Sequence, residues 1–162
     1  MTFVASPAQP PAAAVSDEIA GDDWRPALKL STFKAAVRIG STVTDTRARE
    51  ALLGGINSAD VAIEDWRTGQ EAAGVATLVD AVIRGKPGRV LGAEKLAVIL
   101  YRRAVHAFAA ADLVETHNDV TATDAGRDRR EAQAASADEH RATATRALRD
   151  LMTKGRSKVA LI

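Results

Sequence analysis

The chain has 162 residues, of which 46 % are apolar and 27 % are charged, and its formal net charge is +1. These values indicate one folded domain and exclude a disordered polar chain, and a charge near zero gives no overall attraction to nucleic acid or to an acidic membrane. The absence of cysteine excludes disulfides and thiolate metal sites.

Alanine dominates the apolar content. It supplies 34 residues, whereas Phe, Trp and Tyr together supply six. Alanine is the strongest helix former, but it contributes a single methyl group to a core. We therefore predict an all-α protein, a bundle of about four helices whose modest core leaves surfaces for partners to complete.

Targeting and membrane signals are weak. No apolar run approaches the roughly 20 residues that span a bilayer, and the N-terminus lacks a basic segment ahead of an apolar one. We expect a cytoplasmic protein with no membrane partner.

Three segments follow from composition. Residues 1–22 form an extended Pro/Ala-rich arm, because prolines at positions 7, 10 and 11 exclude a helix or a central strand. This arm is either a disordered tail or a segment that orders against a neighbouring subunit. Residues 23–154 form the helical domain, and residues 155–162 form a short extended tail that ends in apolar residues.

Two helices are predicted in the first half of the domain. The first spans Ser31–Ile39, with Ser31 as its N-cap, and the second begins at Asp45 behind the N-cap Thr44. Apolar residues at spacings of four and three place one continuous stripe on the second helix: Leu52, Ile56, Ala59, Ile63 and Trp66. The pair Gly54-Gly55 within that stripe marks either a bend or a close approach of another backbone.

The second half holds a short helix, a turn and two long helices. We predict the short helix at Ala76–Ile83, the turn at Gly85–Gly88 and a long helix at about Ala93–His117. One side of that long helix carries the apolar residues Leu96, Ile99, Leu100, Ala104, Ala107, Ala111 and Val114.

The last helix, from about Asp124 or Gly126 to Met152, is of a different kind. Between Arg127 and Arg141 it contains only small, polar and charged residues. A core within its own chain does not stabilise such a helix. It is therefore either solvated or a packing surface for another subunit.

No catalytic or metal-binding pattern is present. The histidines at 106, 117 and 140 lack the spacing of a zinc site, and Gly85-Lys86 lacks the other residues of a phosphate-binding loop. No serine lies in a nucleophile motif, and adjacent carboxylates such as Glu64-Asp65 point apart on a helix. We predict no enzyme activity, no catalytic residue, no metal site and no cofactor.

Three arginines stand out at the start of the last helix. Arg127, Arg129 and Arg130 are interleaved with Asp128 and Glu131. One interpretation is a mixed, solvated helix surface, and the other is a mildly positive face toward DNA phosphates or an acidic partner.

Several short segments of the chain, taken in order, resemble segments of the head-completion proteins (the gpL family) of temperate contractile-tailed bacteriophages. Their order and spacing carry the resemblance, which covers nearly the whole chain except the alanine-rich stretch 126–150. The matching segments are Met1-Thr2-Phe3, Trp24 with Pro26, Asp65-Trp66-Arg67, Gln70–Gly74, Ala76–Leu78, Leu100–Val105, Leu113 with Glu115-Thr116 and Asp119, and Val159–Ile162.

The resemblance implies a virion structural protein that completes and stabilises the DNA-filled head. It implies a ring of this protein, twelvefold to match a portal, that lies under the portal protein and bridges it to a tail-terminator or neck protein. The protein would be located in the virion neck and, during assembly, in the host cytoplasm. Non-specific contact with packaged DNA would accompany this position.

The sequence patterns and the resemblance together indicate candidate site residues. Val159, Leu161 and Ile162 are expected to bind the portal, as a strand added to one of its edges. Arg127, Arg129 and Arg130 are expected to contact a neighbouring subunit or the channel. The matched residues Asp65, Trp66, Tyr101 and Arg102 are expected to hold the bundle together.

An alternative function is a small helical DNA-binding or regulatory protein of prophage or bacterial origin. It would require a helix-turn-helix with clustered basic residues, and no such helix pair is visible in the sequence. A salt-sensitive gel shift would favour this alternative.

Overall fold

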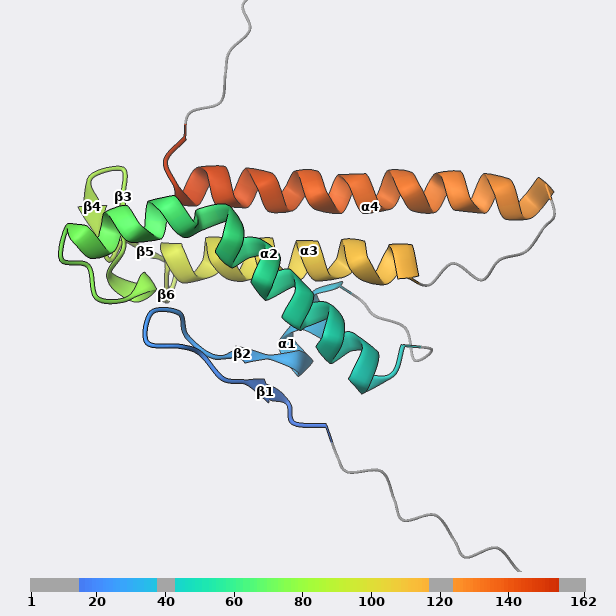
Figure 1. The fold of residues 1–162 in the computed structure, drawn as a ribbon, viewed down its shortest axis with the longest axis horizontal. Coiled ribbons are helices and arrows are strands. Elements are labelled where there is room, and N and C mark those ends of the chain that lie inside the picture. Colours follow the sequence, from blue (N-terminus) through green and yellow to red (C-terminus); the bar gives the residue numbers. More distant parts are fainter. Residues whose placement is uncertain (1–14, 38–42, 117–123, 155–162) are drawn as a thin grey trace, which may run out of the picture.

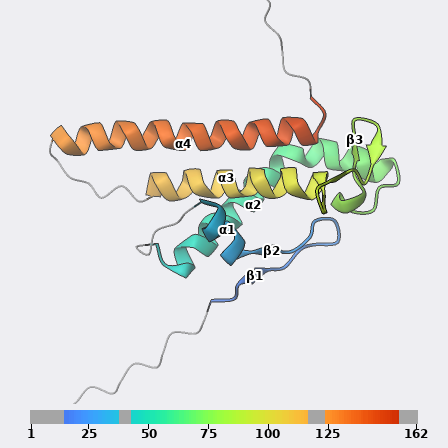
Figure 2. The same ribbon diagram turned by 180° about the vertical axis from the view of Figure 1, so that it is seen from behind.

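The computed structural model describes residues 15–37, 43–116 and 124–154, and within 124–134 it describes the backbone alone. Four helices dominate the described chain, as the sequence predicts: α1 (Leu30–Val37), α2 (Asp45–Ala72), α3 (Leu96–Thr116) and α4 (Asp124–Leu151). Helices α3 and α4 lie side by side and antiparallel, and α2 crosses α3 (Figure 1, Figure 2).

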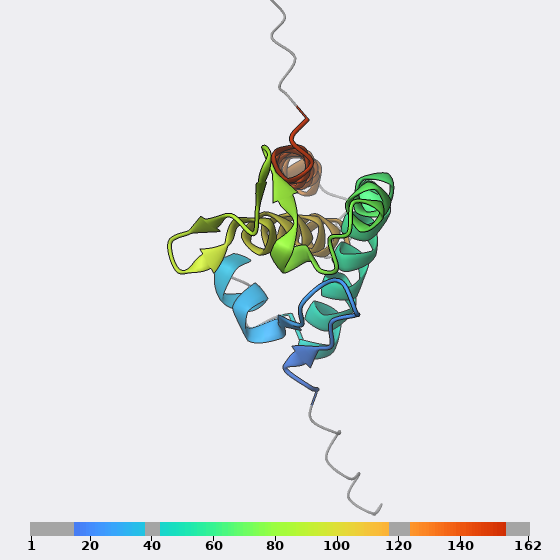
Figure 3. The same cartoon turned by 90° about the vertical axis from the view of Figure 1, so that its left-hand side faces the viewer.

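Helix α3 is the centre of the fold. In the end-on view, α4 lies above it, α2 lies on one side, the hairpin β5–β6 (Val90–Leu91 and Glu94–Lys95) lies on the other, and α1 lies below (Figure 3). Helices on several sides bury α3 around most of its circumference, and alanines let them approach closely. Its buried residues are Ala97, Tyr101, Ala104, Val105, His106, Ala107, Ala109, Ala110, Ala111 and Leu113.

This arrangement corrects the predicted apolar side of α3. Leu96, Ile99, Leu100 and Val114 are only half-buried, whereas Tyr101 is fully buried. A single-face pattern does not describe a helix that neighbours cover on several sides. The helix also begins at Leu96 rather than Ala93, because the residues before it form a hairpin.

Helix α4 packs against α3 through small residues. Ala137 and Ala144 are fully buried, and Ala147, Leu148 and Leu151 are also buried. The prediction that this helix lacks packing within its own chain is therefore wrong for its described second half. Alanines at close spacing serve as the packing surface that larger residues would provide in a wider bundle.

Helix α2 confirms both its predicted cap and its predicted stripe. The Thr44 side chain accepts a hydrogen bond from the backbone N–H of Arg47 at 3.3 Å. Ile56 and Ile63 are at most 5 % exposed, Leu52 and Ala59 are fully buried, and Trp66 is half-buried. The stripe lies against α3, so α2 presents its opposite side to solvent.

The predicted Ser31 cap of α1 is wrong. The helix begins one residue earlier, at Leu30, and Asp17 supplies the cap from outside the helix. The Asp17 backbone carbonyl accepts from the Leu30 N–H at 2.7 Å, and its carboxylate accepts from the Ser31 N–H at 2.7 Å and from the Ser31 hydroxyl at 2.9 Å. Residues 38–39, the predicted end of this helix, lie outside the described residues.

A short hairpin, with strands of two residues each, holds Asp17 in place. Strand β1 (Glu18–Ile19) pairs antiparallel with β2 (Leu28–Lys29), and Ile19 and Leu28 are buried. Residues 15–22 of the predicted arm therefore lie in the described fold. Residues 1–14 and the tail 155–162 lie outside it, and the predicted segment boundaries stay a prediction.

One further hairpin replaces the end of the predicted short helix and shifts the predicted turn. Only Leu78–Asp80 forms a helical turn, of the 3₁₀ type, and β3 (Val82–Ile83) then pairs with β4 (Lys86–Pro87). The turn between them is Arg84-Gly85, where both φ angles are positive, at 51° and 71°. Such a turn matches the twist of a tight hairpin.

Candidate partner-binding surfaces

The predicted site residues lie at the margins of the described structure. Val159, Leu161 and Ile162 fall outside the described residues, and Arg127, Arg129 and Arg130 lie on α4 where only the backbone is described. The N-terminal part of α4 runs past the end of α3 (Figure 1, Figure 2), so α3 does not cover the turns that carry these arginines.

Residues from the motifs that resemble the head-completion family contact one another between the β1–β2 loop and α2. Trp24 and Trp66 pack edge to face with ring centroids 5.8 Å apart. The guanidinium of Arg67 lies 5.1 Å from the centroid of the Trp24 ring and pairs with Glu71 at 2.7 Å. These contacts fasten the β1–β2 loop to α2, which identifies these motif residues as parts of the scaffold.

A polar contact joins α2 and α3 beside the tryptophans. The Tyr101 hydroxyl donates to the Asp60 carboxylate at 2.5 Å, and Arg25 Nε lies 3.4 Å from the other Asp60 oxygen. Burial, reinforced by the hydrogen bond to Asp60, raises the pKa of Tyr101 far above its usual range. The hydroxyl therefore stays protonated and acts as a donor.

Tyr101→Phe is expected to lower the free energy of unfolding by about 1.5 kcal/mol, because a hydrogen bond to a charged group is lost while the ring stays packed. The same substitution in an Asp60→Ala background is expected to cost much less, because the acceptor is already absent. Urea unfolding of the four proteins of this cycle measures the coupling. Equal costs in both backgrounds would show that the hydroxyl contributes nothing through Asp60.

The remaining motif residues divide between scaffold and surface. Arg102 pairs with Glu94 at 2.7 Å and ties the start of α3 to β6. Asp65 is exposed and makes no ion pair or hydrogen bond within the described residues, so the expectation that it holds the bundle together is wrong. Packing within the bundle therefore does not explain why Asp65 is part of the motif.

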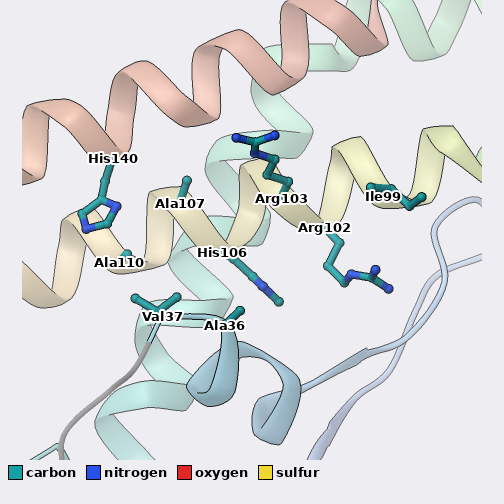
Figure 4. Close-up of a pocket in the computed structure, with 9 residues that line it drawn as sticks. All are labelled: Ala36, Val37, Ile99, Arg102, Arg103, His106, Ala107, Ala110 and His140. Carbon is teal, nitrogen blue, oxygen red and sulfur yellow. The ribbon is translucent and has the colours of Figure 1, made fainter. Parts of the chain in front are cut away.

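A hollow of about 400 Å³ lies between α1, α3 and α4 (Figure 4). Alanines, Val37 and Ile99 line it together with Arg102, Arg103, His106 and His140. His106 is 7 % exposed, its ring lies 5.4 Å from Phe33, and its Nε2 has no hydrogen-bond partner within the described chain. Burial, assisted by the positive charge of Arg102, lowers the pKa of His106 to about 4, so the ring is neutral at pH 7.

The described residues contain no group of three or more His, Cys, Asp or Glu side chains placed to hold a metal ion. Within those residues, no helix combines the length and the apolar character needed to cross a membrane.

Among the side chains that the structure describes, large apolar ones reach the surface in two places. Leu53 and Val61 on α2 are 38 % and 65 % exposed, and Val90 and Leu91 on β5 are 55 % and 59 % exposed. Sequence patterns single out neither pair. A stripe on a long helix shows which side is buried, but apolar residues outside the stripe are easily passed over as ordinary surface.

A helical scaffold that exposes apolar residues on two sides offers surfaces for contact with other chains. The family comparison agrees: the model of the phage head completion protein (GPL) family matches residues 19–162. The chain belongs to this family, and a role in completing the phage head follows from that membership. Comparison with curated proteins and with solved structures finds no match.

Proposed function

We propose that this protein is a non-enzymatic virion protein that forms a ring under the portal of the DNA-filled head and bridges the portal to the tail. The match of the head-completion family to residues 19–162 carries the proposal. In this role its partners are further copies of itself, the portal protein and a tail-terminator or neck protein. Its place is the virion neck, after assembly in the host cytoplasm.

Two segments serve the proposed contacts. The tail residues Val159, Leu161 and Ile162 bind the portal, and Arg127, Arg129 and Arg130 face a neighbouring subunit or the DNA channel. Support for the second assignment comes from α4, whose N-terminal part extends beyond α3 (Figure 1). A helix that leaves its own chain's packing is available to another chain.

The test is the solution mass of the protein alone and mixed with the portal of the same phage, measured by light scattering after size-exclusion chromatography. The proposal expects a portal-bound complex that contains many copies of this protein. A protein that ignores the portal at every concentration would refute the proposed function.

The tail assignment is tested by substitution rather than by truncation alone. Val159→Ser combined with Leu161→Ser and Ile162→Ser is expected to reduce portal-bound protein at least about tenfold, through the loss of apolar burial. The matched control, Lys158→Ser with Ala160→Ser, changes the same segment but spares the large apolar residues. Equal binding by both variants, and by a protein without residues 158–162, would contradict the assignment.

A further inference from the structure

The two exposed apolar pairs lie on opposite sides of the molecule. In the end-on view, α2 lies on one side of α3 and the hairpin β5–β6 lies on the other (Figure 3). Leu53 and Val61 belong to the first side, and Val90 and Leu91 belong to the second. A contact between opposite sides of identical subunits is head-to-tail, and such contacts generate rings when the rotation closes.

The α2 side is acidic around its apolar residues. Residues three or four positions apart form one exposed stripe, the α2 outer face, on the side away from the core. It consists of Glu50, Leu53, Asn57, Val61, Glu64, Asp65 and Thr68, all of them exposed. Glu50, Glu64 and Asp65 make no ion pair within the described residues, and the stripe contains no Lys or Arg.

The hairpin side is basic around its apolar residues. Lys86, on strand β4 of the preceding hairpin, and Arg89, directly before Val90, precede the apolar pair in the chain. Both are exposed and without an ion pair in the described parts of the chain. These four residues are the β5 knob. The acidic Glu94 of the same hairpin is already engaged by Arg102 at 2.7 Å.

We propose that the β5 knob of one copy docks on the α2 outer face of the next copy. Val90 and Leu91 then cover Leu53 and Val61, while Lys86 and Arg89 face Glu50, Glu64 and Asp65. Apolar contact provides the burial, and the opposite charges around it fix the orientation and disfavour knob-to-knob or face-to-face pairing. This contact deepens the proposed ring and rests on the proposed function for its biological setting.

Cysteine cross-linking tests the contact directly, because the natural chain contains no cysteine. The full-length protein with Val61→Cys and Leu91→Cys is oxidised alone at high concentration and also in the presence of the portal. A ladder of covalent multimers on non-reducing gels is expected, since each copy links to two others. The single-cysteine variants are expected to give no species larger than a dimer.

A matched control separates docking from random collision. Thr145→Cys places an exposed cysteine on α4, and its combination with Leu91→Cys is expected to give no ladder. If this control cross-links as well as Val61→Cys with Leu91→Cys does, the specific contact is refuted. The absence of a ladder both alone and with the portal also refutes it.

Charge reversal tests the proposed orientation. Glu64→Lys with Asp65→Lys in the two-cysteine protein is expected to reduce the ladder at least about tenfold, because like charges then face each other. Adding Lys86→Glu and Arg89→Glu is expected to restore it. A ladder that the first change leaves intact, or that the second change fails to restore, would overturn the proposed pairing of charges.

The two proposals fail in different ways. Portal-bound multimers that form normally when Val90 and Leu91 are both changed to Asp would refute this contact and leave the proposed function standing. A specific ladder from the protein with Val61→Cys and Leu91→Cys, in a chain that never binds the portal, would support the contact and refute the function.

Discussion

Gly55→Ala is expected to destabilise the protein by about 3 kcal/mol, because the added methyl group enters a helix contact that has no room for it. A Cβ atom at this position would lie 2.5 Å from the carbonyl oxygen of Val105 and 3.0 Å from the backbone nitrogen of Ala109. Both are backbone atoms of α3, so no side-chain rotation relieves the overlap. The two helices would have to separate, and the packing along their contact would loosen.

The neighbouring glycine provides the matched control. A Cβ atom at Gly54 would meet nothing within 4 Å, so Gly54→Ala should gain helix propensity at no steric cost. Its free energy of unfolding is expected to rise by about 1 kcal/mol. Urea titration followed by helical circular dichroism measures both variants, and a Gly55→Ala protein as stable as Gly54→Ala would refute the close approach of α2 and α3.

The glycine pair shows which features of the fold can be predicted from the sequence and which cannot. The spacing of Leu52, Ile56 and Ile63 predicts α2 and its buried side correctly, because that information is local. Whether the pair marks a bend or a close approach depends on the position of α3, about 50 residues further along the chain. A contact between distant segments leaves no periodic trace in either of them.

The wrong predictions have three physical causes. Ser31 is a good N-cap residue by local rules, but Asp17 lies close enough to cap α1 only because β1 pairs with β2. The two-residue strands are too short to show an alternating pattern, so the hairpins after Leu78 cannot be recognised from the sequence. The buried alanines of α4 could not be told from surface residues in the sequence, because alanine is common both in cores and on exposed helix faces.

The candidate surfaces are harder to predict than the scaffold. Trp66 and Tyr101 do pack in or against the core, since large aromatic residues in a chain with so few are rarely left exposed. Asp65 shares a motif with Trp66, yet it lies on a different, exposed side of the helix. Exposed pairs such as Val90 and Leu91 gain meaning only when the fold shows which charges surround them. The tail and arginine assignments stay predictions.

Acidification from pH 7 to pH 4.5 is expected to cost the protein about 2 kcal/mol of stability through His106 alone. The pKa of this ring is about 4 in the folded state, against an ordinary value of 6.5. Between these values the unfolded chain binds a proton that the folded chain does not, so stability falls as the pH falls. The stability that depends on a neutral His106 is therefore fully present above pH 6.5, and it is lost as the pH falls toward 4.

His106→Leu removes this titration while it keeps an apolar side chain of similar size beside Phe33. The free energy of unfolding of the wild type minus that of His106→Leu, measured by urea titration at several pH values, should therefore fall by about 2 kcal/mol from pH 7 to pH 4.5, whichever protein is the more stable at pH 7. His140→Leu, at the rim of the same hollow, retains the buried ring and should keep the His106 component. A wild-type protein whose stability runs parallel to that of His106→Leu from pH 7 to pH 4.5 would show that the folded protein protonates this ring as readily as the unfolded chain does. In that case solvent or a partner atom must reach Nε2, and the hollow around it would be more open than its 7 % exposure indicates.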